Sequence, residues 1–258
     1  MSASLQDVVV ALDTELRSAD VPDYPGAMNG LQVANQGRVH RVAVAVDGSL
    51  VTVKAALTAR ADLLVLHHGL FWGGVQPLTG LAYEKYNAML LGGLAVYASH
   101  LPLDMHPVHG NNACLARALG LTPTGGFARF KNIEIGLRGD AHESTADLVD
   151  RVRALVAPYG GIVRTSVPVK GRKTARWAVC SGGGASSDTL QEARELGVDT
   201  LIVGEGPHHT TVEAAEHGIC VVYAGHYATE TLGVQAIGKL LETRFGLPWT
   251  FLHLPTGS

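Results

Sequence analysis

Short runs of apolar and β-branched residues alternate with helical stretches along this chain, and this alternation constrains the fold more than any other feature. A helix is expected at 5–17, where apolar residues recur at helical spacing. None of the strand-like runs alternates strictly, as expected for strands covered on both faces. The pattern predicts an α/β fold with mostly parallel sheets covered by helices. The predicted strands are 41–46, 63–66, 94–98, 133–137, 162–164, 177–180, 200–203 and 219–223.

The order of these runs indicates an internal duplication. The segments at 42–49, 61–69 and 93–100 match those at 177–184, 198–206 and 218–226 in the order strand, helix, strand. Similar strand–helix–strand units can also arise independently, which is the alternative. We interpret the match as two α/β halves, 1–125 and 126–258.

The two copies also share a chemical pattern. In each copy the third strand leads to a histidine and, four residues later, an acid: His100 and Asp104, then His226 and Glu230. On a helix this offset puts both side chains on one face. Thr229 is expected to cap that helix, with Glu230 in its first turn. The alternative for the second pair is a capping threonine followed by an acid that favours the helix dipole.

The pair His67-His68 follows an apolar strand and precedes Gly69. Neighbouring residues on a regular strand point to opposite faces. The two rings therefore reach one site only where the strand breaks, which Gly69 permits, or each ring serves a different metal ion. The alternative is a pair of hydrogen-bonded structural histidines.

Ligands of open α/β sheets bind beyond the carboxyl ends of the strands. The histidines and acids described above occupy such positions, and a pseudo-two-fold relation would bring them together in a cleft between the halves. Imidazole and carboxylate ligands suit Zn, Mn, Fe, Co or Ni. Cys114, Cys180 and Cys220 are expected to be reduced core residues, so a closed structural zinc site is not favoured.

Several neighbouring residues have two interpretations. Glu205 is either a general base or a carboxylate that orients a histidine ligand. His208 or His209 either shuttles protons or begins a helix at the surface. His100 either supports the site or contacts the substrate. Phe71 and Trp72 either stack on a base of the substrate or pack within the protein. The run Gly182-Gly183-Gly184 lacks the glycine spacing of a dinucleotide-binding motif and is interpreted as a turn between a strand and a helix.

Composition narrows the classes of partner. The formal charge of −3 argues against a dedicated nucleic-acid or membrane-surface binder, although a small anionic substrate needs only local positive charge. No apolar run has the roughly 20 residues needed to cross a bilayer. The first residues have no basic segment, so a secretory signal is not expected. A cytoplasmic location is expected instead.

Taken together, the motifs resemble the Nif-three-like dinuclear metal-centre family, whose members are often named GTP cyclohydrolase I type 2. The resemblance covers nearly the whole chain. Many relatives have proline where this chain has Gly69. The resemblance rests on the segments 67–72, 100–104, 204–209 and 224–230, together with 29–33 and 110–112.

The resemblance implies a site for two divalent ions, with Glu230 as the bridging carboxylate. It also implies a ring-shaped homo-oligomer, often a hexamer. The short stretch between the two copies places this chain with the compact members of the family, which lack an inserted middle domain. The implied metal ligands are His67, His68, Asp104, His226 and Glu230.

Two functions remain open from the sequence. The first is a metal-dependent hydrolase for a small phosphorylated or nucleotide substrate, with Glu205, His208 and His100 as candidate catalytic residues. The second is a non-catalytic metal-binding ring that serves as a chaperone, metal store or interaction partner. A nucleic-acid clamp is a third idea, which the acidic balance disfavours.

Overall fold

The computed structural model describes residues 2–257, and contacts divide the chain into two compact units. Unit 1 contains the residues up to Leu103 together with Gly233–Leu254. Unit 2 contains Asp104–Leu232 and the residues from Pro255 onward. The predicted halves divide the chain at 125/126 instead, so the two divisions differ over 104–125 and over the C-terminal segment. The internal duplication stays a prediction.

Unit 1 is built on a five-stranded sheet in the order β13-β4-β5-β6-β2. β4, β5 and β6 are parallel and confirm three of the predicted strands, while β13 adds a parallel edge and β2 an antiparallel one. β1 (Ala3–Ser4) and β3 (Arg38–Val39) form a separate antiparallel pair. The five strands are β13 (Trp249–Phe251), β4 (Val42–Asp47), β5 (Leu63–His68), β6 (Ala95–Ala98) and β2 (Gly30–Val33).

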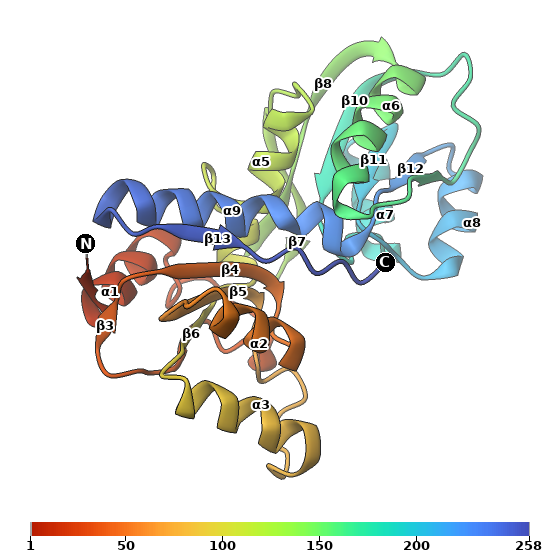
Figure 1. The fold of residues 1–258 in the computed structure, drawn as a ribbon. Helices are drawn as coiled ribbons and strands as arrows, with labels where there is room; N and C mark the ends of the chain where they lie inside the picture. The colour runs from red at the N-terminus through yellow and green to blue at the C-terminus, as the bar shows by residue number, and fades with distance from the viewer. Residues whose placement is uncertain (1, 258) are drawn as a thin grey trace. The chain divides into compact units, whose positions relative to one another are not determined.

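Helices cover the sheet of unit 1, as the apolar strands require. The side chains of Ser4 and Ser49 cap α1 and α2 by accepting hydrogen bonds from backbone N–H groups of the first turn. α2 and α3 lie beside each other in Figure 1, and their apolar residues pack with Leu64 and Leu66 of β5. α1 contacts Tyr97 of β6, whose hydroxyl donates to Asp13 at 2.8 Å. The helices are α1 (Leu5–Leu16), α2 (Leu50–Thr58) and α3 (Gly80–Leu91).

Unit 2 has a mixed six-stranded sheet in the order β7-β8-β10-β11-β12-β9. β10, β11 and β12 are parallel, in the same sequential order as β4, β5 and β6. The other pairings are antiparallel, so the sheets are mixed rather than uniformly parallel. The strands are β7 (Gly125–Phe130), β8 (Ile133–Ser144), β10 (Lys173–Cys180), β11 (Thr200–Val203), β12 (Cys220–Tyr223) and β9 (Arg164–Thr165).

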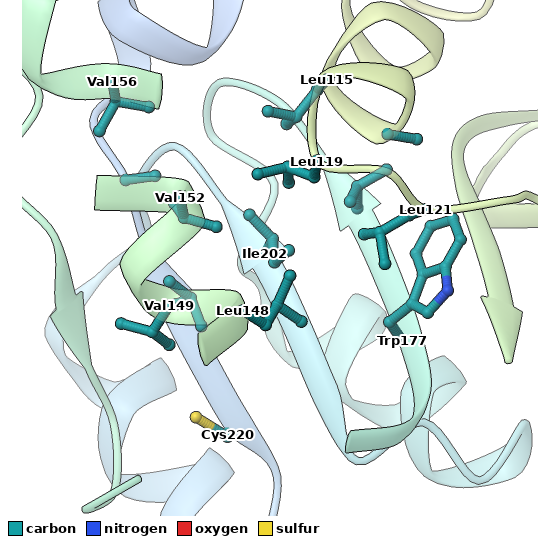
Figure 2. Close-up of a cluster of buried hydrophobic side chains, with 14 of the residues drawn as sticks. Leu115, Leu119, Leu121, Leu148, Val149, Val152, Val156, Trp177, Ile202 and Cys220 are labelled. Carbon is teal, nitrogen blue, oxygen red and sulfur yellow. The ribbon is translucent and has the colours of Figure 1, made fainter. Parts of the chain in front are cut away.

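The core of unit 2 lies on both faces of this sheet. Trp177 and Val179 of β10 pack under α5 and α6 in the cluster shown in Figure 2, whereas Ala178 and Cys180 of the same strand pack under α7 and α8. This two-residue alternation between two apolar faces explains why the segment 177–180 of β10 has no polar position. The helices are α5 (Asn111–Ala118), α6 (Thr145–Val156), α7 (Ser187–Glu195) and α8 (His208–Glu216).

Two further helices carry candidate site residues. α4 (Leu101–Asp104) is a single turn that ends at Asp104, and α9 (His226–Phe245) begins at His226. Thr229 therefore lies inside α9 and is not its cap; the prediction was wrong because the helix already begins at His226, three residues before Thr229. Among the described residues, no helix combines the length and apolarity that a membrane span requires.

Candidate functional site

Three histidines gather at the carboxyl ends of β5 and β6 in unit 1. β5 ends at His68, and its ladder with β6 stops at the pair Leu66 and Ala98, so His67 and His68 extend past that ladder. Their ring centroids are 4.7 Å apart. The ring of His100 lies 5.1 Å from that of His67. The ligand nitrogens of the three histidines lie within 4.8 Å of one another, so this group could hold a metal ion.

Gly69 lies where the strand gives way to a loop, as predicted. β5 ends at His68, directly before this glycine. A Cβ at Gly69 would clash with the side chain of Gln32, which occupies the space beside this glycine. Oε1 of Gln32 accepts a hydrogen bond from the backbone N–H of Leu70 at 2.8 Å. Gly69 therefore admits the side chain that fixes the loop after β5.

Hydrogen bonds orient the rings of His67 and His68. Nδ1 of His67 lies 2.9 Å from the carbonyl oxygen of Ser99. Nδ1 of His68 lies 2.8 Å from Oδ1 of Asp47, its partner residue on β4. A carbonyl or carboxylate oxygen accepts, so Nδ1 is the donor in each contact. In a neutral ring this tautomer leaves the lone pair on Nε2, the arrangement common in metal-binding histidines.

His100 is oriented in the same way by the loop before β2. Its Nδ1 lies 2.8 Å from Oδ1 of Asp23, whose other oxygen accepts from the backbone N–H of Leu101 at 2.9 Å. Burial raises the pKa of Asp23, but hydrogen bonds from His100 and Asn29 outweigh this effect and hold it below its usual value. The carboxylate of Asp23 is therefore ionised at neutral pH and accepts both hydrogen bonds.

A second set of donors lies in unit 2 on α9. Nδ1 of His226 lies 2.8 Å from Oε1 of Glu205, and its Nε2 lies 3.2 Å from Oε2 of Glu230. The helical offset of four residues thus brings His226 and Glu230 together, as predicted. Burial lowers the pKa of His226, but the carboxylates of Glu230 and Glu205 raise it by more, to about 9.

Asp104 and Glu230 form a buried carboxylate pair in unit 2. Their side-chain oxygens lie within 4.8 Å of each other, and the residues are only 5% and 3% exposed. Asn111 Nδ2 and Ser181 Oγ both donate to Oδ1 of Asp104, at 2.9 and 3.2 Å. Two buried carboxylates so close together repel each other unless a cation or a proton lies nearby.

The turn after β10 supports both carboxylates. The backbone N–H of Ser181 donates to Oδ1 of Asn112 at 2.8 Å, and that of Gly182 donates to Oγ1 of Thr229 at 3.0 Å. Gly182 has a φ of 62°, in the left-handed region that favours glycine. The glycine run is therefore a turn, as predicted, with a close approach to α9 in addition.

A polar cavity of about 560 Å³ adjoins the second set of donors within unit 2. Glu205, His208, Thr211 and Tyr223 line it together with Arg164 of β9. His209 is not among its lining residues. Arg164 contributes a positive charge to this lining.

Aromatic residues adjoin the histidines of unit 1. The ring of Trp72 lies edge-on to that of His100 at 4.8 Å and to that of His68 at 6.0 Å. Phe71 instead stacks with Tyr86 of α3 at 6.4 Å. The two consecutive aromatic residues therefore lie in different environments, although both had the same two interpretations from the sequence.

The residues that orient the predicted ligands were not among the predicted site residues. They are short polar residues with no unusual local spacing, and they lie 7 to 77 residues from the ligand-bearing segments that they contact. Two signals were present: Asp47 follows the end of a predicted strand, and Asn111 and Asn112 lie in a segment on which the family resemblance rests. The missed residues are Asp23, Asp47, Ser99, Asn111, Asn112 and Ser181.

The donor chemistry fits divalent metal ions. Each of the four histidines has its Nδ1 against an oxygen acceptor, and the two buried carboxylates add negative charge. This combination of imidazole and carboxylate donors is the one that borderline transition metals prefer.

Comparison with known proteins identifies relatives over the full length. The family model Duf34/NIF3 (NGG1p interacting factor 3) matches residues 3–256. A protein of Deinococcus radiodurans named GTP cyclohydrolase 1 type 2 homolog is 39% identical over 97% of this chain and 93% of its own length. A protein of Halobacterium salinarum with the same name is 40% identical over 98% and 99%. The solved structure of TTHA1606 from Thermus thermophilus has 34% identity and a TM-score of 0.81, covering 99% of this chain and 100% of its own.

Proposed function

Because this chain belongs to the Duf34/NIF3 family, we propose that it binds two divalent metal ions and uses them to hydrolyse a small phosphorylated or nucleotide substrate. The observation that carries the proposal is the common orientation of four histidine rings, each with Nδ1 held by an oxygen acceptor. Relatives named GTP cyclohydrolase 1 type 2 homolog support the nucleotide version.

In this proposal His67 and His68 would supply imidazole nitrogens, and Asp104, His226 and Glu230 would supply the remaining donors. Divalent ions held by such ligands act as Lewis acids and lower the pKa of water. His100 is a further imidazole of the same group in unit 1 and stays a candidate for substrate contact.

Glu205 is proposed as a positioning residue rather than as the general base. Its Oε1 is engaged by His226 at 2.8 Å, so the carboxylate holds the ring and strengthens it as a donor. His208 lines the same cavity and is the better candidate for moving a proton. Arg164 would bind the anionic part of the substrate.

Metal content tests the proposal first. Wild-type protein purified without chelator is expected to carry close to two transition-metal equivalents per chain by plasma mass spectrometry. Asp104→Ala and Glu230→Ala should lose most of this metal, whereas Glu216→Ala, a change at an exposed acid on α8, should not. Wild-type protein with less than half an equivalent that added Zn, Mn, Fe, Co or Ni cannot raise would overturn the proposal.

Turnover decides between the two open functions. Metal-loaded protein should release product from GTP or from a panel of phosphoesters, and Arg164→Met should raise KM more than it lowers kcat. Full metal occupancy without turnover of any member of the panel would favour the non-catalytic metal-binding assembly.

The proposed homo-oligomer has support from α3. Leu81, Leu90 and Leu91 are 72%, 68% and 82% exposed, an unusual amount of apolar surface on one helix. Light scattering coupled to gel filtration should show an assembly, up to the proposed hexamer. Replacement of Leu90 and Leu91 with lysine should reduce it to smaller species.

A further inference from the structure

Unit 1 contains a cavity whose lining includes none of the candidate metal ligands. Its volume is about 610 Å³, within the usual range for small-molecule sites. The loop around η1 (Pro25–Ala27), the loop after β5 and one face of α3 enclose it. The lining is mainly apolar and includes Pro25, Met28, Leu70, Phe71, Val75 and Tyr86.

Hydrogen bonds and close packing fix the two loops that form its walls. Nε2 of Gln32 donates to the carbonyl oxygens of Ala27 and Met28, while Oε1 of the same side chain accepts from the N–H of Leu70. A Cβ at Gly26 would lie 3.1 Å from Cα of Trp72, so the loops also touch backbone to backbone. The cavity is therefore formed before any ligand arrives.

Two aromatic rings give the cavity flat surfaces. Phe71 and Tyr86 lie with their centroids 6.4 Å apart and their planes at 26°. Rings arranged in this way favour a planar aromatic guest, which can stack against a face or an edge. Ala82 lies on the same face of α3 as Tyr86 and leaves room between the walls.

Lys85 is the one charged residue among the lining residues of this cavity. Its Nζ donates to the carbonyl oxygen of Gly48 at 3.2 Å and lies 5.7 Å from the centroid of Tyr86. Burial lowers the pKa of the Lys85 ammonium. A single anionic group on a ligand would offset this cost of burial, whereas several negative charges would find no second cation among the lining residues.

We infer that this cavity is a binding site for a planar aromatic molecule that carries one negative charge, with Lys85 as its counter-ion. The site goes beyond the proposed metal function. It takes an aromatic carboxylate or sulfonate in preference to a nucleoside triphosphate, whose several charges it does not match.

The test uses two fluorescent probes with metal-free protein. 8-Anilinonaphthalene-1-sulfonate carries one negative charge, and N-phenyl-1-naphthylamine is its neutral counterpart. Wild-type protein should bind one equivalent of each per chain. Lys85→Met should lower the affinity for the sulfonate probe about tenfold, which is the usual effect of losing one charge-assisted contact. The affinity for the neutral probe should stay within twofold of the wild-type value. Lys85→Arg should restore most of the sulfonate affinity.

Two variants serve as controls. Lys54→Met removes an exposed lysine on α2 and should change neither affinity. Ala82→Phe fills the cavity and should abolish binding of both probes while the circular dichroism spectrum stays unchanged. GTP at millimolar concentration should not displace the sulfonate.

Four results would overturn the inference. The first three are the absence of probe binding, equal effects of Lys85→Met and Lys54→Met on affinity, and displacement of the sulfonate by micromolar GTP. The fourth is probe binding that appears only when an oligomer dissociates, because a second copy of the chain would then occupy the cavity. Because the probes are measured without metal, failure here is distinct from failure of the proposed metal site.

Discussion

Gly182 lies directly against the carboxylate of Glu230. A Cβ added at Gly182 would clash with Oε1 of that carboxylate and would lie 3.1 Å from Nε2 of His226. The backbone of Gly182 also has a φ of 62°. The absence of a side chain at this position thus lets the turn after β10 pack against two proposed ligands.

Gly182→Ala should therefore displace Glu230 and weaken metal binding by about tenfold or more. It should also cost about 1 kcal/mol or more of stability, because L side chains are strained in the left-handed region. Gly183→Ala is the matched control, since a Cβ there meets nothing within 4 Å. Competition with a chelating dye measures the affinity, and thermal unfolding of the metal-free variants measures the stability. Equal metal affinities of the two variants would show that Gly182 has no part in positioning Glu230.

Asn112 joins three segments of unit 2 through one buried side chain. Its Oδ1 accepts from the N–H of Ser181, and its Nδ2 donates to the carbonyl oxygens of Asp104 and Ile135. Asn112→Ala leaves these buried groups without partners and should lower the free energy of unfolding by about 2–4 kcal/mol. Asn87→Ala on α3 should change it by less than about 1 kcal/mol. Urea denaturation of the metal-free proteins checks the difference, and equal midpoints would contradict this role.

Substitutions at Glu205 separate positioning from base catalysis. Glu205→Gln keeps an oxygen that can accept from Nδ1 of His226, so metal content should stay near the wild-type value. Glu205→Ala removes the acceptor and should weaken metal binding by about 10–100-fold. If Glu205 is the general base instead, Glu205→Gln should abolish turnover with full metal occupancy, and Glu205→Ala should leave the metal affinity unchanged.

Metal uptake should release protons at neutral pH. In the metal-free protein the pKa of His226 is raised to about 9, because Glu230 and Glu205 together outweigh the effect of burial. At pH 7.5 the ring is therefore an imidazolium, and it must lose a proton before Nε2 can ligate. Calorimetry in buffers of different ionisation enthalpy should show about one proton released through His226 at pH 7.5 and much less at pH 10. Equal proton release at both pH values would contradict the assignment of His226.

Local patterns in the amino-acid sequence were enough to specify the fold class and the placement of the ligand-bearing segments. Apolar runs located β4, β5, β6 and β10 to β12, because burial on both faces requires uninterrupted apolar residues. The spacing of His226 and Glu230 predicted their contact, since a helical offset of four residues is a local geometric relation.

How the ligands are held depends on contacts between distant segments, which appear only in the folded chain. Asp47 meets His68 because β4 and β5 pair in register, and Asp23 meets His100 across 77 residues. The edge strands β2 and β13 are short and lie far in sequence from their partners, so their runs did not identify them. Periodicity and helical spacing are short-range properties of the chain, whereas these hydrogen bonds depend on strand order and on packing, which a local pattern does not encode.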